Sequence, residues 1–281
     1  MEQWLDIGPD HASFMTLKRA RLAGCPPLYY RSIESSRPAQ AELLRQVVDN
    51  LLAHHGDAFT RQGDVLIDHL DGSRHDLADG GREPLDVLGA LAEEDFVLFD
   101  PEAGPALMTA ASNAYTSSGR IVSCVGQGMH FAHEPVPGLN QALASRIDRV
   151  IGNVQKDKPV VRFNWFVTPI GTRLYPEHSE AMHVERQQAM ARRLAAEPDM
   201  AGQLMWLRVE HQSFVRLPET GALAFGIHTY SDPLSSIAGD RDSLSALHRL
   251  LGSYSEERLA YGGMLATRAP VMRWIEDRLA A

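Results

Sequence analysis

The chain has 281 residues, of which 44% are hydrophobic and 22% charged, so it can bury a sizeable core as one large domain or two small ones. Its formal net charge of −9 excludes a protein that binds nucleic acid or an anionic membrane through a concentrated basic surface. A neutral or cationic ligand, or a basic partner protein, fits this charge better.

The first ten residues, MEQWLDIGPD, lack the basic start and apolar run of an export signal, and no apolar segment of membrane-spanning length follows. Cys25 and Cys124 are the only cysteines, and they lie far apart in no Cys-x-x-Cys pattern. A disulfide framework and a Cys-rich zinc site are therefore excluded. Together these features predict a soluble protein of the reducing cytoplasm.

The first half of the chain shows one helix and one hairpin. Apolar residues at helical spacing predict a helix over Ala39–Ala53. The region Gly56–Gly89 mixes Gly, Asp, Arg and His around the short apolar run VLID, and is interpreted as loops with one short strand. The runs EEDFVLFD and PALMTAASNAY then flank turn residues, which predicts an antiparallel hairpin.

The stretch FAHEPVPGLN, residues 131–140, places His133 just ahead of a Pro-Val-Pro segment. Each proline fixes its own φ and restricts the residue before it, so His133 has little backbone freedom beside them. Such a place suits a side chain that must point in one direction. An amphipathic helix is predicted to follow, with Asn140 as its N-cap and an apolar stripe from Leu143 to Val154.

Period-two alternation predicts three strands further along the chain. VVRFNWFV places Arg162, Asn164 and Phe166 on the polar face of the first strand. Two longer alternating runs flank the turn 218–221 and form the clearest hairpin of the sequence.

The second strand of that hairpin has one face of small residues, Ala222, Ala224 and Gly226, followed by His228. This face leaves room for a tightly packed helix, which we favour, or for a flat ligand. From Asp242 onward, helical spacing predicts two closing helices, and the pattern Ser253-x-x-Glu256 is typical of a capping box.

The common catalytic motifs are absent from the sequence: it has no Walker A loop, no Gly-x-Gly-x-x-Gly after a strand, no Gly-x-Ser-x-Gly and no His-Glu-x-x-His. His178, His183 and Glu185 resemble a metal-binding set, but a spacing of five turns the two imidazoles to different faces of a helix, so a solvated helix is favoured. Cys124 lies in an apolar context and is expected in the core. Four further histidines are expected at the surface: His54, His55, His69 and His75.

The middle of the chain contains DFVLF, a second strand, His133-Glu134-Pro135-Val136-Pro137, Arg162-Phe163-Asn164-Trp165 and LRVEHQSFVRLPETGALAFGIHTYSDPL, in this order. This ordered set, from about Glu94 to Leu234, resembles the haem-dependent oxidative N-demethylase family, the haem subunits of dimethylamine monooxygenases. Each piece alone is a weak signal, whereas the ordered combination is specific.

The resemblance implies an α+β fold in which a PAS-like antiparallel sheet is flanked by helices, with N- and C-terminal helical additions. It implies a single haem-binding domain over residues 1–281. Its haem b, through the iron, would activate dioxygen, so that an N-methyl group of a small amine substrate is hydroxylated and lost as formaldehyde.

The electrons for such a reaction must come from outside the chain. It has neither a dinucleotide fingerprint nor the four cysteines of a plant-type iron–sulfur site. We therefore expect a separate reductase subunit that carries FMN and a 2Fe-2S cluster and takes electrons from NADPH, as the resemblance also implies.

The resemblance also points to site residues. His133 is the first choice as axial ligand of the iron, since a neutral imidazole is a common haem ligand; its alternative role is a hydrogen bond to backbone at the start of a helix. Arg162 is expected to pair with a haem propionate, with Asn164 beside it, or otherwise to form a salt bridge to a neighbouring helix. Glu210 is the expected partner of an alkylammonium substrate, because a buried cation needs a compensating charge.

The sequence departs from the family pattern in several places. His211 and His228 stand where arginine is usual, so propionate binding can differ and both are rivals to His133 as iron ligand. Gly119 and Arg120 replace a usual aromatic-basic combination, which leaves the substrate open.

Two other functions remain possible on the sequence. One is a non-catalytic PAS-like haem sensor or carrier, because one fold hosts many functions. The other is a PAS-like protein that has lost haem and binds another small molecule. The lack of an attached output domain favours the enzyme.

Overall fold

The computed structural model describes residues 3–100, 107–115, 120–128, 152–156, 158–175 and 180–280. The chain forms two compact units. Unit 1 holds the described residues of 1–135, 139–163 and 211–228, and unit 2 holds those of 164–210 and 229–281. The expectation of a single domain stays a prediction.

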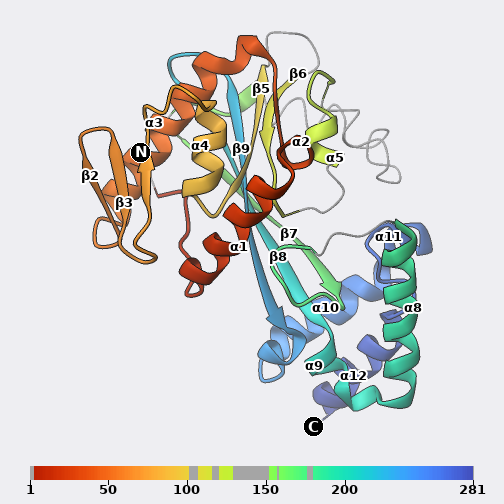
Figure 1. Ribbon diagram of the computed structural model, residues 1–281. Coiled ribbons are helices and arrows are strands. Elements are labelled where there is room, and N and C mark those ends of the chain that lie inside the picture. The colour runs from red at the N-terminus through yellow and green to blue at the C-terminus, as the bar shows by residue number, and fades with distance from the viewer. Residues whose placement is uncertain are drawn as a thin grey trace. The chain divides into compact units, whose positions relative to one another are not determined.

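A six-stranded sheet has the strand order β1-β6-β5-β9-β8-β7, and β5 pairs antiparallel with both β6 and β9 (Figure 1). Its strands are β1 (Tyr30–Ser32), β5 (Asp95–Asp100), β6 (Leu107–Ser112), β7 (Val160–Thr168), β8 (Trp206–Arg216) and β9 (Leu223–Pro233). The strands β7, β8 and β9 each contribute residues to both units. The predicted α+β class, the β5–β6 hairpin and the β7, β8 and β9 strands are confirmed, whereas the PAS-like topology stays a prediction.

Unit 1 contains further helices and a small second sheet. The helices are α1 (His11–Gly24), α2 (Pro26–Tyr29), η1 (Glu34–Ser36), α3 (Arg37–His54), α4 (Pro84–Leu91) and α5 (Arg120–Ser123). The small sheet has the order β2-β3-β4, with β2 (Phe59–Gln62), β3 (Val65–Asp68) and β4 (Arg74–Asp76). The predicted helix over Ala39–Ala53 is α3.

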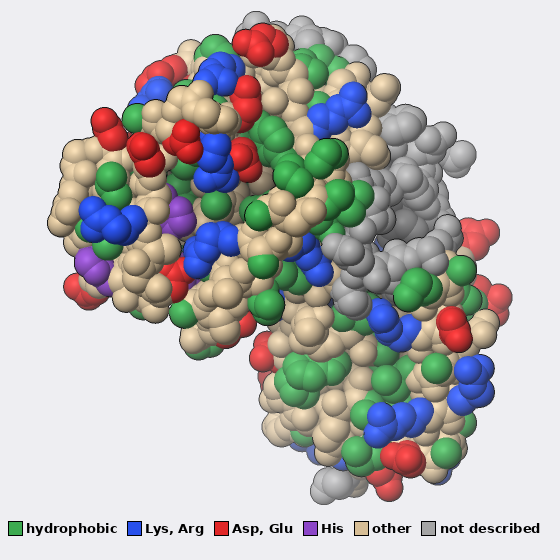
Figure 2. All heavy atoms as spheres, viewed as in Figure 1, with side chains coloured by type: hydrophobic (Ala, Val, Ile, Leu, Met, Phe, Trp, Pro, Cys, Tyr) green, Lys and Arg blue, Asp and Glu red, His purple; other side chains and the backbone are tan. Residues whose placement is uncertain are grey.

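The short strand predicted around VLID is β3, but the prediction of loops for the rest of Gly56–Gly89 is wrong, because this region also forms β2, β4 and α4. Its strands are short and carry many exposed polar residues, which hides the alternation. Gly63 has a φ of 61° and allows the tight turn between β2 and β3. Acidic and basic side chains are interspersed over the visible face of this sheet (Figure 2).

The main core of unit 1 lies between α3, α4 and the sheet. Ala222, just ahead of β9, and Ala224 of β9 are buried in one cluster with Leu43 and Val47 of α3 and Leu88 of α4. This part of the face of small residues therefore packs in a core with helices, in agreement with the favoured interpretation, whereas Gly226 lies against Ser213 and Phe96 of the neighbouring strands.

Unit 2 is mainly helical. Its elements besides the strands are α8 (Glu180–Ala196), η2 (Pro198–Met200), α9 (Ala201–Leu204), η3 (Leu234–Ile237), α10 (Arg241–Ser253), α11 (Glu256–Tyr261) and α12 (Arg268–Ala280). Three helices instead of two thus follow Asp240. The predicted capping box is wrong, because Ser253 ends α10 and its hydroxyl donates to the Leu250 carbonyl, whereas Ser255 caps α11 and accepts from the Arg258 N–H.

Glu42 of α3 holds the turn between β8 and β9. Its carboxylate accepts hydrogen bonds from the backbone N–H groups of Glu219 and Thr220, at 2.7 and 2.8 Å, and from the Thr220 hydroxyl at 2.6 Å. Glu42 is only 1% exposed, so water cannot replace these bonds. The carboxylate therefore fixes a hairpin turn far away in the sequence.

The variant Glu42→Gln is expected to lower the free energy of unfolding by about 2 kcal/mol, because its NH2 group faces donors that then lack an acceptor. Urea denaturation measures this change. The control is Glu219→Gln, which leaves the backbone of the turn in place and removes only an exposed ion pair with Arg45, so it is expected to cost about 0.5 kcal/mol or less. Equal losses in both variants would show that Glu42 does not hold the turn.

Candidate functional site

Two residues predicted for the site, Asn164 on β7 and Glu210 on the neighbouring strand β8, contact each other. Within unit 2 the side-chain amide of Asn164 donates a hydrogen bond to Oε2 of Glu210, over 3.3 Å. Both side chains are half-buried. A carboxylate held by an amide in this way can still accept hydrogen bonds from, and pair with, a cationic group. Arg162 is exposed on β7 and, by strand alternation, shares the face of Asn164.

His211 follows Glu210 on β8 and so points to the other side of the strand. Within unit 1 its ring centroid is 5.3 Å from that of Phe163, with the rings tilted by 44°. Phe163 is 64% exposed, and Val161, two residues earlier on the same face of β7, is 42% exposed. His211 is therefore a half-buried imidazole next to exposed apolar side chains.

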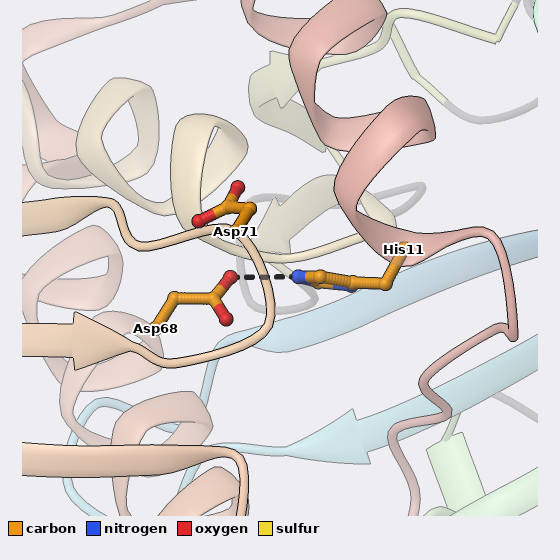
Figure 3. Close-up of side chains that lie close together, drawn as sticks. All are labelled: His11, Asp68 and Asp71. Atoms are coloured by element: carbon orange, nitrogen blue, oxygen red, sulfur yellow. Dashed lines mark hydrogen bonds and ion pairs between the residues drawn. The ribbon is translucent and has the colours of Figure 1, made fainter.

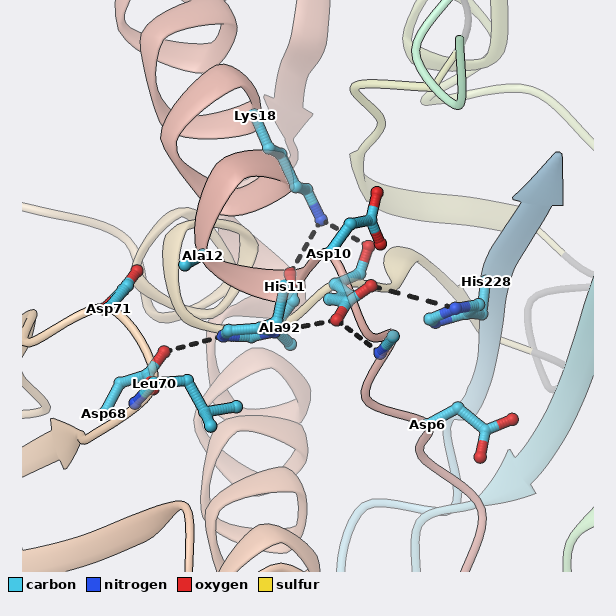
Figure 4. A network of polar contacts seen from close by, with 12 residues as sticks. Asp6, Asp10, His11, Ala12, Lys18, Asp68, Leu70, Asp71, Ala92 and His228 are labelled. Atoms are coloured by element: carbon cyan, nitrogen blue, oxygen red, sulfur yellow. Dashed lines mark hydrogen bonds and ion pairs between the residues drawn. The ribbon is translucent and has the colours of Figure 1, made fainter. Parts of the chain in front are cut away.

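His228 lies in a different environment, fully buried on β9 in unit 1. Its Nδ1 is 3.5 Å from a carboxylate oxygen of Glu94, and its Nε2 is 3.8 Å from one of Glu93. Both acidic residues belong to the short segment between α4 and β5. His228 is thus part of a buried polar network, shown in Figure 4.

His11, at the start of α1, lies at the centre of this network. Its Nδ1 is 2.7 Å from Oε1 of Glu93, and its Nε2 is 2.7 Å from Oδ2 of Asp68. Burial alone would lower the pKa of His11, but the hydrogen bonds to Asp68 and Glu93 and the charges of both carboxylates outweigh it and raise the pKa to about 9. At neutral pH the ring is therefore an imidazolium that donates to a carboxylate on each side.

Lys18, two turns further along α1, is completely buried. Its ammonium group donates to the carbonyl oxygens of Ala92, Glu93 and Glu94 at 2.9, 3.1 and 2.6 Å, and lies 3.2 Å from a carboxylate oxygen of Asp95. Burial lowers the pKa of Lys18 and raises that of Asp95, and the charge of each residue opposes the shift in the other. The segment 92–95 is thus fixed to α1 through buried charge.

The network also brings His11, Asp68 and Asp71 together, with one potential metal-ligating atom of each within 4.8 Å of the others (Figure 3). Both ring nitrogens of His11 already face carboxylates, and the Arg19 guanidinium pairs with Asp71. Because two protein cations neutralise these carboxylates, the group is interpreted as an ionic network and not as a metal centre.

The sequence reasoning missed this network. The feature of the sequence that points to it is the helical spacing in α1. Phe14, Met15 and Leu22 form a buried stripe there, and His11 and Lys18 lie on the same stripe. Two polar residues on a buried stripe weaken the apolar pattern.

The expectations for single residues had mixed outcomes. His75, expected at the surface, is buried and lies 2.9 Å from the Ser73 hydroxyl, because β4 turns it inward. His54 and His69 are exposed as expected, and His55 is half-buried. Cys124 is buried in a hydrophobic cluster, which confirms its core position.

Several predicted residues lie outside the part of the chain that the structure describes. They are Gly119, His133 with its flanking prolines, and His178, together with the side chains of Arg120 and His183. Their predicted roles stay predictions.

A family model described as "Haem-dependent oxidative N-demethylase, alpha subunit-like" matches residues 1–272. The chain belongs to this family. The match confirms the resemblance and extends it over α1 and, toward the C-terminus, as far as the first residues of α12. As a haem-dependent oxidative N-demethylase-like protein, the chain has an oxidative demethylase role, which is oxidoreductase chemistry. Among the described helices, none combines the length and apolar character needed to cross a membrane.

The described residues of this N-demethylase-like chain fit a haem group in their chemistry. His211 supplies an imidazole, the commonest protein ligand of haem iron, and Phe163 and Val161 supply exposed apolar surface beside it. His228 fits less well, because two carboxylates flank it and none of its surface is exposed.

Proposed function

We propose that the protein is the haem-binding subunit of a monooxygenase that removes an N-methyl group from a small alkylamine, dimethylamine or another N-methylated metabolite, and releases formaldehyde. The family match over residues 1–272 carries this proposal. The half-buried carboxylate of Glu210 supports the amine as substrate, because a cation that leaves water needs a negative partner.

Glu210 and Asn164 hold the substrate in this proposal. Asn164 donates to one carboxylate oxygen of Glu210, which helps to orient the carboxylate, and the negative charge of the carboxylate pairs with the alkylammonium ion. The same carboxylate can take up the proton when the amine becomes neutral. Haem, when bound, supplies the chemistry of oxygen activation.

His133 is proposed as the axial ligand of the iron of haem b, with His211 as its rival, and Arg162 as the partner of a propionate. A haem bound to His211 would lie on the face of β8 opposite Glu210, so the substrate role of Glu210 is proposed together with His133 as the ligand. His228 remains a third candidate that its enclosure disfavours. A separate reductase with FMN and a 2Fe-2S cluster delivers electrons from NADPH, and dioxygen is the second substrate. Turnover by the purified chain with NADPH alone would contradict the need for this partner.

The test is the visible absorption spectrum of the purified protein after addition of haemin, in oxidised, reduced and CO-bound forms. Wild type is compared with His133→Ala, His211→Ala and His228→Ala. A stoichiometric Soret band that shifts in only one variant identifies the ligand. Lack of stoichiometric haem binding by the wild type would contradict the proposal, and haem binding without formaldehyde release in a reductase-coupled assay would indicate a sensor or carrier.

A further inference from the structure

The charged ring of His11 joins the start of α1 to two other parts of unit 1. His11 links α1 to β3 through Asp68 and to the segment before β5 through Glu93. The carboxylate oxygen of Glu93 that contacts His11 also accepts the Gly8 N–H at 2.8 Å, so it binds the chain just ahead of α1 as well. Figure 4 shows the contact of the His11 ring with Asp68.

The surroundings of His11 are otherwise apolar or already paired. The ring of Phe59, on β2, meets the imidazole edge-on, with centroids 6.0 Å apart. His11 is 2% exposed, Asp68 is 1% exposed and Glu93 is fully buried. Water therefore has little access to replace a lost hydrogen bond at this position.

The other ionisable groups of the network have partners of their own. Asp71 pairs with Arg19, and Asp95 pairs with Lys18. Glu94, on the far side of Glu93, faces His228. His75 hydrogen-bonds Ser73 on the small sheet, and its pKa is lowered by burial and by Arg19. Within the described residues, Asp68 and Glu93 are thus the two groups that contact His11 directly.

We propose that His11 is a proton-dependent latch: its imidazolium holds the start of α1 on unit 1, and loss of its proton in alkaline solution releases this end of the helix. A neutral imidazole has one N–H group and one lone pair. One of the two carboxylates then faces a lone pair at 2.7 Å, which is repulsive, and the buried network gains one uncompensated negative charge.

The pH range follows from the direction of the shift. The pKa of His11 is raised from 6.5 to about 9 in the folded protein. A group with a raised pKa stabilises the folded state fully below its unfolded value and loses this contribution as the pH rises through the folded value. The latch is therefore closed at neutral pH and opens around pH 9.

Hydrogen exchange of backbone amides in α1, followed by mass spectrometry from pH 7 to 10.5 and corrected for intrinsic exchange rates, tests the proposal. Protection of peptides from His11–Gly24 is expected to fall with a midpoint near pH 9, while peptides from α12 in unit 2 stay protected. The ring resonances of His11 in an NMR titration are expected to shift with the same midpoint.

A variant that neutralises one carboxylate distinguishes deprotonation of His11 from deprotonation of Lys18, whose ammonium group also loses its proton in alkaline solution. Asp68→Asn removes one of the two carboxylates on His11 and no contact of Lys18, so the midpoint is expected to fall by about 1 pH unit or more. The control Asp71→Asn loses a partner of Arg19 and is expected to shift the midpoint much less.

Unchanged protection of α1 up to pH 10.5 in the wild type, or a His11 resonance that titrates near pH 6.5, would overturn the latch. Equal midpoints in Asp68→Asn and wild type would assign the opening to another group. The wild-type titrations decide the matter even where a variant does not fold.

Discussion

Replacing Lys18 by methionine is expected to lower the free energy of unfolding by about 3–5 kcal/mol, because it removes one partner of a buried ion pair. Methionine fills a similar volume but donates no hydrogen bond. The carboxylate of Asp95 would lose its buried cation, and the carbonyls of Ala92, Glu93 and Glu94 would lose a common donor. Urea or thermal denaturation at neutral pH measures the loss.

Two further variants make this measurement specific. Lys156→Met is the control, because Lys156 is exposed and, among the described residues, its ammonium group donates to the Pro218 carbonyl alone, so a change of about 0.5 kcal/mol or less is expected. In the double variant Lys18→Met with Asp95→Asn, no charge is left buried without its partner, and part of the lost stability is expected to return. A loss below 1 kcal/mol in Lys18→Met would contradict the role of this buried charge.

The sheet could be predicted from the sequence because alternation is a local property. β7 and the β8–β9 hairpin have one apolar face, and the turn at 218–221 carries the residues that such turns require. The same holds for α3, in which apolar residues recur at helical spacing from Leu43 to Leu52. The small face near the start of β9 favoured a packed helix over a flat ligand, since closely packed helices need small neighbours, and its alanines lie in a core with α3 and α4.

The polar interior could not be predicted, because its partners are far apart in the sequence. Glu42 and Thr220 are separated by 178 positions, and His11 and Glu93 by 82. A histidine and a lysine on an otherwise apolar stripe look like surface residues until their carboxylate partners are known. The strands β2 and β4 were missed for a related reason, since most of their residues are exposed and show no apolar period, whereas the buried β3 was predicted from its apolar run.

The contacts of the candidate site could not be predicted for the same reason. Asn164 and Glu210 were each predicted from the resemblance, but their hydrogen bond joins residues 46 positions apart and follows only from the pairing of β7 with β8. That His211 and Glu210 face opposite sides follows from their adjacency on one strand. The carboxylates around His228, in contrast, come from a segment that no local pattern connects to β9.

Replacing Glu210 by glutamine is expected to lower kcat/KM for oxidative demethylation by about 100-fold, equivalent to about 2.7 kcal/mol. Glutamine keeps the size of the side chain and can still accept a hydrogen bond from Asn164, so the local fold is retained. It lacks the negative charge that compensates an alkylammonium ion leaving water. Since this charge acts on binding, most of the loss is expected in KM. Formaldehyde release in a reductase-coupled assay measures both constants.

The haem content of each variant separates the role of Glu210 from that of the cofactor. A Soret band equal to that of the wild type is expected in Glu210→Gln, because no iron ligand is changed. Asn164→Ala, which removes only the donor that orients the carboxylate, is expected to lose about 10-fold in kcat/KM, equivalent to one hydrogen bond to a charged group. The exposed Glu185→Gln on α8 is the matched control with wild-type kinetics. Full haem content together with unchanged kcat/KM in Glu210→Gln would show that the substrate amine finds its negative partner elsewhere.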